Sequence, residues 1–340
     1  MSAILVWGSG AIGGSIGAAL ADAGREVVFV DRDIDHVAAI NASGLRITGP
    51  IREYTVQARA STPDQIEGVF ETVLLCVKAQ HTEAAARALL NHLATDGCVV
   101  SVQNGLNERV ISDVVGAART IGCFVNFGAD YHGPGLIMYG GRGAVVVGEI
   151  DGLRTPRIEA IHGLFRIFDA DAVLTDNIWG YLWSKLIYGG LLFATALTND
   201  SIADVLDAKR YRPVLKALGQ EIAAVAAAEG VRLEAFNGFD PAAFVAGAPA
   251  DALDRSFADM VAFNRKSAKT HSGIWRDLAV RKRRTEIDLL APVVQVGRED
   301  GIPTPFCSRL VTLIREIEDG QRKQDWATLD ALAAATGNML

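Results

Sequence analysis

The sequence predicts an α/β domain built on a parallel sheet, followed by an all-α domain. Short apolar runs alternate with helical patterns through the first half of the chain, and after residue 176 no strand-like run remains. Such alternation is typical of a parallel sheet covered by helices on both faces. The chain has 340 residues, whereas a single hydrophobic core stops growing at about 250–300 residues. We therefore expect two domains, covering residues 1–175 and 176–340.

The first predicted domain begins with repeated strand–helix pairs. Strands are expected at residues 4–7, 26–30, 72–77 and 98–102, and helices at residues 11–23, 33–42 and 81–93. An antiparallel pair is predicted across residues 45–60, because the Gly49-Pro50 dipeptide marks a turn. Glycines interrupt short apolar runs in residues 120–150, which predicts antiparallel strands appended to the parallel sheet. A helix at residues 156–168 and a strand at 172–174 complete this domain.

The second predicted domain consists of long helical patterns with strongly apolar faces. They cover residues 178–197, 211–229, 286–300 and 304–318. These apolar helices also offer a candidate homodimer face.

Composition excludes several classes of protein. The 33 basic and 40 acidic residues give a net charge of −7, which argues against a dedicated nucleic-acid binder. No stretch reaches the ~18 apolar residues that a membrane-spanning helix needs, and the N-terminus lacks the basic and apolar regions of a signal peptide. The four cysteines show no CxxC spacing. Free thiols in a reducing cytoplasm are therefore expected, with no metal site.

A glycine-rich motif connects the first strand to the first helix. It reads Gly8-Ser9-Gly10-Ala11-Ile12-Gly13, and the second strand after it ends at Asp31. In a Rossmann-type fold, the first glycine permits a tight turn, the second lets the backbone approach a pyrophosphate, and the third lets helix and strand pack closely. The helix N-terminus offers free N–H groups to the phosphates. We therefore predict a dinucleotide site here; the alternative is a glycine-rich turn without a ligand.

The residues after the second strand give conflicting indications about the cofactor. Asp31 lies where a carboxylate usually binds the 2′-hydroxyl of the adenosine ribose, which favours NAD(H). Arg32 follows directly and offers a guanidinium to a 2′-phosphate, which favours NADP(H). A third interpretation is a surface ion pair between the two side chains.

Several polar residues interrupt apolar segments. Lys78, Gln103 and Asn104 follow predicted strands, at the sheet edge where ligands collect in open α/β folds. Lys185 lies in the apolar helical segment WGYLWSKLIYGGLLFATAL, where burying an unpaired ammonium is costly. It is therefore a catalytic candidate; the alternative is a lysine whose stem covers apolar surface while its ammonium reaches water. Glu286 begins a later helix, where a carboxylate also complements the helix dipole.

Five stretches of the sequence resemble the ketopantoate reductase (2-dehydropantoate 2-reductase) family. They are GSGAIGG near the N-terminus, CVKAQHT at 76–82, QNGLN at 103–107, WSKL at 183–186 and TEID at 285–288. Their order spans nearly the whole chain. The resemblance implies an NADPH-dependent reductase of a 2-oxo acid in pantothenate biosynthesis, with a 6-phosphogluconate-dehydrogenase-like helical second domain.

The resemblance also implies roles for individual residues. The family's catalytic lysine falls on Lys185, its carboxylate on Glu286 and its asparagine after the strand on Asn104. The strand-end lysine falls on Lys78, and the cofactor arginine falls on Arg32, so that NADP(H) is favoured while NAD(H) stays open. The expected cofactor set is Gly8, Ser9, Gly10, Ala11, Ile12, Gly13, Asp31, Arg32, Lys78, Gln103 and Asn104.

The positions that hold the substrate depart from the family pattern. The family has asparagines four and eight residues after the catalytic lysine, where this chain has Gly189 and Phe193. The family's serine before the TEID motif is replaced by Gly273, with Ser272 beside it. Partners of a substrate hydroxyl account for large discrimination factors. We therefore expect a roomier, more apolar pocket and a substrate other than ketopantoate, with Tyr188 as a replacement hydroxyl.

Together these residues predict hydride transfer from a nicotinamide to the C2 carbonyl of a 2-oxo acid. Lys185 would protonate the carbonyl oxygen, Glu286 would orient the substrate or the lysine, and Asn104 would bridge cofactor and substrate. A non-catalytic NADP-binding redox sensor is an alternative, although it needs none of these three residues. A dehydrogenase of another hydroxy substrate is a third possibility. The basic run RKRR at 281–284 is interpreted as solvated or subunit-facing, or as attracting an anionic substrate.

Overall fold

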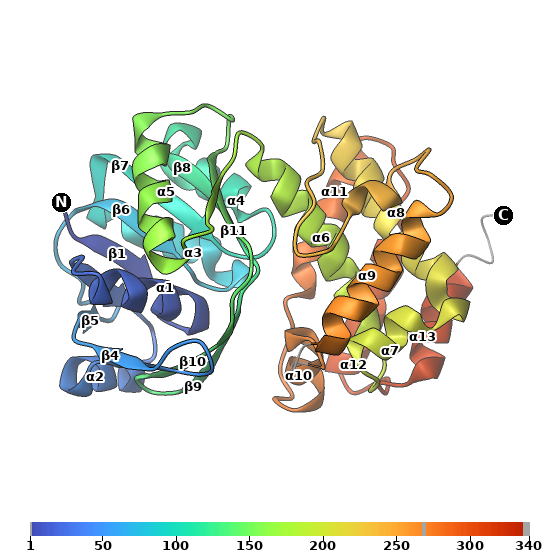
Figure 1. Ribbon diagram of the computed structural model, residues 1–340, viewed down its shortest axis with the longest axis horizontal. Coiled ribbons are helices and arrows are strands. Elements are labelled where there is room, and N and C mark those ends of the chain that lie inside the picture. Colours follow the sequence, from blue (N-terminus) through green and yellow to red (C-terminus); the bar gives the residue numbers. More distant parts are fainter. Residues whose placement is uncertain (1, 267–269, 336–340) are drawn as a thin grey trace. The chain divides into compact units, whose positions relative to one another are not determined.

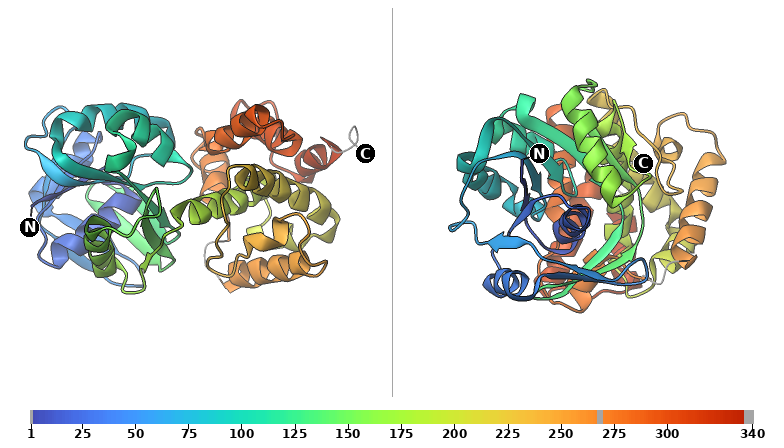
Figure 2. Two further views of the ribbon diagram at one scale, coloured as in Figure 1. Left: turned by 90° about the horizontal axis from the view of Figure 1, so that it is seen from above. Right: turned by 60° about the vertical axis from the view of Figure 1, so that its left-hand side comes forward.

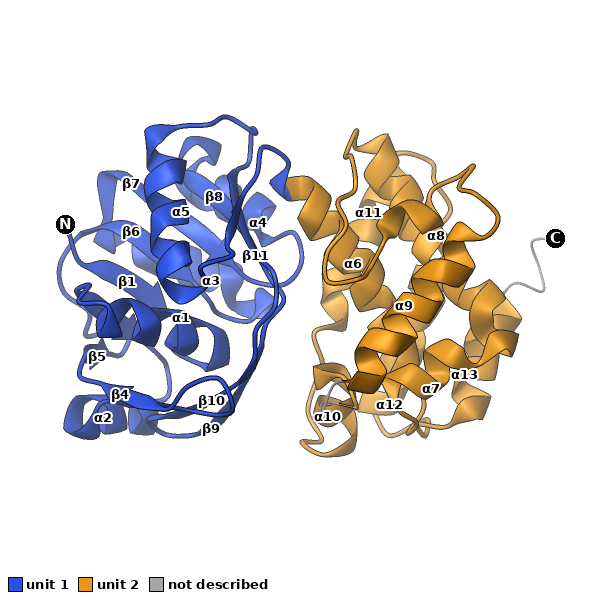
Figure 3. Ribbon diagram, viewed as in Figure 1, with its two compact units in different colours: residues 1–178 blue, residues 179–340 orange. Residues whose placement is uncertain are grey.

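The computed structural model describes residues 2–266 and 270–335, and it divides into two compact units (Figure 3). Unit 1 covers residues 1–178 and unit 2 covers residues 179–340. Unit 1 alternates strands and helices, and unit 2 is helical (Figure 1). This architecture confirms the predicted fold class.

Unit 1 contains an eight-stranded main sheet with the order β12-β11-β8-β7-β6-β1-β2-β5. All neighbouring strands pair in parallel except β11, which is antiparallel to β8. The strands are β1 (Ile4–Trp7), β2 (Val27–Val30), β5 (Arg59–Ser61), β6 (Phe70–Leu75), β7 (Leu93–Val102), β8 (Thr120–Val125), β11 (Val145–Glu149) and β12 (Val173–Leu174).

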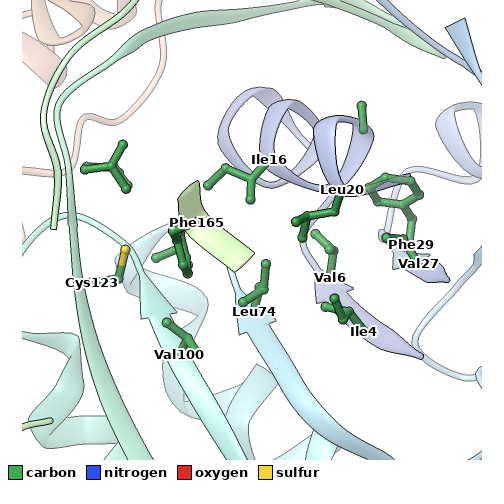
Figure 4. Close-up of a cluster of buried hydrophobic side chains, with 14 of the residues drawn as sticks. Ile4, Val6, Ile16, Leu20, Val27, Phe29, Leu74, Val100, Cys123 and Phe165 are labelled. Carbon is green, nitrogen blue, oxygen red and sulfur yellow. The ribbon is translucent and has the colours of Figure 1, made fainter. Parts of the chain in front are cut away.

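Both faces of the main sheet are covered by helices (Figure 2). Because successive side chains point to opposite faces of a strand, Ile4 and Val6 of β1 belong to one core cluster and Leu5 and Trp7 to the other. Figure 4 shows the first cluster, to which helices on that face contribute. These helices are α1 (Ala11–Asp22) and α5 (Pro156–Phe168), and the other face carries α3 (Thr82–Leu89) and α4 (Asn107–Val115).

A second sheet of four strands, with the order β4-β3-β10-β9, lies in the same unit. Its strands are β3 (Leu45–Thr48), β4 (Tyr54–Val56), β9 (Gly128–Gly133) and β10 (Leu136–Gly141). The antiparallel β3–β4 pair confirms the prediction for residues 45–60. The prediction for residues 120–150 was wrong in part, because β8 is parallel to β7 and the β9–β10 hairpin pairs with β3. The partner strand of β10 lies far away in the sequence, so no local pattern indicates this pairing.

The second sheet packs closely against α1. A Cβ atom added to Gly14 would lie 2.1 Å from Cδ1 of Ile137 in β10. Glycine therefore allows the helix and the second sheet to approach each other. The helix after β2, α2 (Ile34–Ser43), lies beside β9 and β10 (Figure 1).

Unit 2 is built from helices. They are α6 (Ile178–Thr195), α7 (Ile202–Asp207), α8 (Arg212–Ala228), α9 (Ala252–Lys266), α10 (Gly273–Ala279), α11 (Ala291–Glu299), α12 (Pro305–Glu318) and α13 (Trp326–Ala333). The four predicted helices correspond to α6, α8, α12 and a 3₁₀ turn followed by α11. Throughout residues 2–266 and 270–335, no helix is long and apolar enough to cross a membrane. The four cysteines are free thiols, as predicted.

Candidate functional site

Each glycine of the motif occupies a position that suits its predicted role. Gly8 has a φ angle of +100°, and a Cβ there would lie 2.9 Å from main-chain atoms of Cys76 and Val77. A Cβ on Gly13 would lie 2.1 Å from the Gly8 carbonyl oxygen. By contrast, nothing lies within 4 Å of the Cβ position of Gly10, the N-cap of α1. The backbone is therefore compact at two glycines and open at the third, which fits the pyrophosphate of a dinucleotide.

The Asp31 carboxylate is directed back at the glycine-rich loop. Its Oδ2 accepts hydrogen bonds from the Ser9 N–H at 2.9 Å and from the Ser9 hydroxyl at 3.2 Å. Its Oδ1 accepts the Asp33 N–H at 3.1 Å. Arg32, in contrast, is exposed. The hydrogen bonds of the Asp31 carboxylate thus connect the loop after β1 to the end of β2.

A buried hydrogen-bond network joins the stretches CVKAQHT and QNGLN. The Gln103 side-chain amide donates to the Val77 carbonyl at 2.8 Å and to the Thr82 hydroxyl at 2.7 Å. Thr82 donates to Asn107 Oδ1 at 3.0 Å, and the Asn107 amide donates to the Asn104 carbonyl at 2.6 Å. The network fixes the ends of β6 and β7 relative to each other, and it leaves the Asn104 side chain exposed. Gln103 therefore holds the loop, whereas Asn104 is accessible to a ligand.

Lys78 and Lys185 lie in different units. Lys78 is partly exposed at the end of β6, where it caps the 3₁₀ turn Ala79–His81. Lys185 lies on α6 in a stripe of partly exposed residues that continues through Tyr188, Gly189 and Leu192, and the intervening residues are buried. Steps of three and four residues place side chains on one face of a helix. The accessible face of α6 therefore carries Lys185.

Tyr188 is held by its ring and by its hydroxyl group. Its ring packs edge-on against Phe236, with centroids 6.0 Å apart, and tilted against Phe239 at 5.4 Å. The Asn264 amide donates to the Tyr188 hydroxyl at 3.2 Å and to the Met260 carbonyl at 2.8 Å. Burial raises the pKa of Tyr188, so the hydroxyl keeps its proton at neutral pH.

The other predicted substrate residues are less accessible. Phe193 is buried, so Leu192 continues the accessible stripe in its place. Ser272 is buried too, and its hydroxyl oxygen accepts the Trp275 N–H at 3.1 Å as the N-cap of α10. A Cβ on Gly189 would have no neighbour within 4 Å, and the same holds for Gly273. The substrate roles of these residues stay predictions.

Glu286 is half-buried in front of the 3₁₀ turn Ile287–Leu290. Its neighbour Thr285 donates both its N–H and its hydroxyl to Glu318 Oε1, each at 2.7 Å. Arg284 donates to the other oxygen of Glu318 at 2.9 Å. The TEID stretch is therefore fixed to the end of α12, independently of any ligand.

The basic run at 281–284 carries ion pairs within unit 2. Arg281 and Arg283 contact Asp277 at 3.1 and 2.9 Å. Arg284 contacts both Glu318 and Asp319. These pairs favour the interpretation of this run as a solvated structural segment.

Three polar residues near these sites were not predicted. His36 in α2 is buried and contacts the Ser9 carbonyl, and Glu108 in α4 is fully buried. Asn264 in α9 holds Tyr188. For His36 a sequence signal existed, because positions 36, 37 and 40 form the buried face of α2. For Asn264 the partner Tyr188 lies on a distant element, and the burial of Glu108 depends on tertiary packing, neither of which periodicity alone reveals.

A doubly covered parallel sheet with an open glycine-rich loop, joined in one chain to a helical unit with an accessible lysine, is typical of nicotinamide-dependent oxidoreductases. The chain matches the family model described as ketopantoate reductase PanE/ApbA over residues 4–152, and the model of its C-terminal region over residues 177–318. The chain therefore belongs to the ketopantoate reductase family.

Relatives with curated names support this assignment. The chain is 29% identical to the 2-dehydropantoate 2-reductase of Archaeoglobus fulgidus over 321 residues, covering 93% of this chain and 98% of the relative. It is 30% identical to the enzyme of that name from Pyrococcus abyssi over 242 residues, covering 70% of this chain and 75% of the relative.

One solved structure supports the same family, and a second shares the fold. A PanE/ApbA family ketopantoate reductase from Ralstonia eutropha JMP134 has a TM-score of 0.78 and 30% identity, covering 94% of this chain and 99% of that one. The ternary structure of D-mandelate dehydrogenase with NADH and anilino(oxo)acetate has a TM-score of 0.81 and 21% identity, with the same coverage, and it shows the shared fold.

Proposed function

We propose that the protein reduces the C2 carbonyl of a 2-oxo acid and that Lys185 is the general acid. The observation that carries this proposal is the position of Lys185, within the WSKL stretch and on the accessible face of an otherwise apolar helix. A nicotinamide, when bound, supplies the hydride. An ammonium group there stabilises the negative charge that develops on the carbonyl oxygen and donates the proton to it. Asn104 contacts the ligand at the sheet edge, and Glu286 orients the substrate or the lysine.

The general-acid role is tested with Lys185→Ala, using the exposed lysine Lys216 of α8 as the control position. The loss of a positioned general acid lowers kcat by about 10²–10⁴-fold. We expect this loss for Lys185→Ala with unchanged cofactor affinity, and wild-type turnover for Lys216→Ala. Undiminished turnover of Lys185→Ala on the best substrate would refute the role.

For the substrate, we propose a 2-oxo acid with a larger and more apolar side chain than ketopantoate. Gly189 leaves open space on the face that carries Lys185, and beside it lies the partly exposed Tyr188 ring, which the buried Phe236 and Phe239 hold in place. Since the Asn264 amide donates to the Tyr188 oxygen, the hydroxyl proton is directed elsewhere and can be donated to a substrate oxygen.

A comparison of kcat/KM for ketopantoate and for aromatic 2-oxo acids tests this substrate class. Gly189→Asn restores the family's asparagine at a position with room for a side chain. We expect the variant to gain kcat/KM for ketopantoate and to lose it for aromatic substrates. Gly163→Asn in α5, where a Cβ also meets nothing within 4 Å, is the control. A wild-type preference for ketopantoate would contradict the proposal.

For the cofactor, we propose that NAD(H) is accepted at least as well as NADP(H), although Arg32 alone favours NADP(H). The support is the Asp31 carboxylate, which hydrogen bonds from Ser9 and Asp33 hold toward the glycine-rich loop. A fixed carboxylate accepts ribose hydroxyls and repels a 2′-phosphate. Fluorescence titrations of NADH and NADPH test this preference. Asp31→Asn should tighten NADPH binding by about tenfold, and a wild-type preference for NADPH that Arg32→Ala abolishes would contradict it.

A further inference from the structure

His36 makes two hydrogen bonds that connect the glycine-rich loop to the second sheet. Its Nε2 lies 2.9 Å from the Ser9 carbonyl oxygen, and its Nδ1 lies 2.9 Å from the Gly135 nitrogen. The ring is buried, at 1% exposure. Because an N–H of the backbone can only donate, Nδ1 accepts the Gly135 proton, and Nε2 must carry the proton that Ser9 accepts. The contacts therefore define one tautomer of a neutral imidazole.

Gly135 is itself anchored in the second sheet. It lies between β9 and β10, with a φ angle of +69°, and its carbonyl accepts the Arg46 N–H of β3 at 2.9 Å. The β9–β10 hairpin thus fixes His36 from one side, and this hairpin is itself paired with β3. On its other side it contacts Ser9, whose N–H and hydroxyl bind Asp31. The second sheet is in this way linked to the loop that faces the cofactor.

A second contact connects the same sheet to the turn after β2. Tyr131 of β9 packs edge-on against the His36 ring, with centroids 5.1 Å apart, and its hydroxyl donates to Asp33 Oδ2 at 2.9 Å. Although burial acts to raise the pKa of Asp33, hydrogen bonds from the backbone N–H of His36, the Tyr131 hydroxyl and the backbone N–H of Asp35 lower it. Asp33 is therefore a fixed anion that caps α2 and holds Tyr131 against His36.

From these contacts we infer that His36 is a positioning residue for dinucleotide binding. The Nε2–H of His36 donates to the Ser9 carbonyl and so holds the Ser9 peptide in one orientation. In this orientation the loop leaves open space at Gly10 for a dinucleotide. This inference rests on the proposed function, since it takes the loop as the cofactor site. If His36 only stabilised the fold, losing either hydrogen bond would affect dinucleotide affinity equally. If His36 positions the loop, losing the hydrogen bond to Ser9 lowers this affinity most.

Two conservative variants separate the two hydrogen bonds. The side-chain amide nitrogen of His36→Gln reaches the position of the imidazole Nε2 and keeps the hydrogen bond to Ser9. The side-chain oxygen of His36→Asn reaches the position of Nδ1 and keeps the hydrogen bond to Gly135. His162 in α5 is the control position, because its Nε2 lies 2.8 Å from the Ala172 carbonyl oxygen, on a different element from the glycine-rich loop.

The experiment is a fluorescence titration of NADH and NADPH against folded wild type, His36→Gln, His36→Asn and His162→Gln. In His36→Asn the buried Ser9 carbonyl loses its donor. Such a loss weakens binding by about 5- to 100-fold, so we expect a rise of this size in the Kd of the dinucleotide. His36→Gln and His162→Gln should stay within about threefold of wild type. Equal losses in both His36 variants, or none in His36→Asn, would overturn the inference.

A spectroscopic measurement on the wild type makes the inference independent of variant folding. Nitrogen NMR of labelled histidine should show an unprotonated Nδ1 and a protonated Nε2 for His36, both without and with NADH. The opposite tautomer, or a doubly protonated ring at neutral pH, would overturn the inference. If the wild type binds neither dinucleotide, the proposed function itself fails. If the wild type binds and the His36 variants bind equally well, only the positioning role fails.

Discussion

The fully buried carboxyl group of Glu108 makes the stability of unit 1 depend on pH. Glu108 lies in the first turn of α4, and neither of its carboxyl oxygens has a hydrogen-bond partner among the described residues. Burial raises the pKa of Glu108 from its ordinary value of 4.5 to about 8, against a smaller lowering by its own backbone and by groups of Ser101 and Cys123. The folded protein therefore keeps this carboxyl protonated at neutral pH, whereas the unfolded chain ionises it.

The sign and size of the effect follow from proton linkage. Because the pKa is higher in the folded state, unfolding releases a proton between the two pKa values, and stability decreases as the pH rises. The slope approaches about 1.4 kcal/mol per pH unit where only the unfolded chain is ionised. Between about pH 5.5 and pH 7.5, the free energy of unfolding should therefore decrease by about 2–3 kcal/mol through Glu108 alone.

Urea denaturation followed by circular dichroism measures this slope. Glu108→Gln keeps the shape of the side chain and cannot ionise. Between about pH 5.5 and pH 7.5, its free energy of unfolding should therefore lack the decrease of about 2–3 kcal/mol that Glu108 contributes. Glu67→Gln replaces an exposed carboxyl of the same unit and should keep the wild-type pH dependence. Parallel pH profiles for wild type and Glu108→Gln would show that the buried carboxyl is ionised in the folded protein, and would refute this reasoning.

Two further predictions concern close packing and a buried ion pair in unit 1. Gly17→Ala places a Cβ 2.4 Å from the ring of the buried Phe29, so thermal denaturation should show a loss of about 1–3 kcal/mol; a more stable variant would contradict the packing argument. Arg157→Met removes the guanidinium that contacts the buried Glu149 at 2.5 Å, which should cost about 3–5 kcal/mol in urea denaturation. Adding Glu149→Gln should recover most of this loss, and an additive double variant would contradict it.

The main sheet was predictable because its determinants are local. Each of the strands β1, β2, β6 and β7 contains a short apolar run, and the segments between them have helix-forming patterns of their own. The glycine-rich motif was equally readable, since a φ of +100° at Gly8 and the close approach at Gly13 both exclude a side chain. In these cases the physical constraint acts within a few residues or on a backbone conformation that one residue type adopts easily.

The second sheet was not predictable in the same way. The β9–β10 hairpin is an antiparallel pair, and nothing in its own residues chooses between pairing with β8 and pairing with β3. The choice is made by packing, since Ile137 of β10 fits against the glycine face of α1 at Gly14. The preference of β10 for β3 therefore depends on a packing contact between segments more than 100 residues apart in the sequence.

Gln103 and Asn104 show the same limit within the candidate site. They are adjacent, both follow β7 and both are amides, so the sequence placed them together in one cofactor set. In the structure the amide nitrogen of Gln103 donates twice into the protein, and the Asn104 side chain is exposed. Since a buried acceptor that loses its donor costs more than an exposed one, substitution of Gln103 should disturb the loop itself, while substitution of Asn104 should affect only what the loop binds. Neighbouring polar residues at a sheet edge thus divide into those that contact a ligand and those that shape its site.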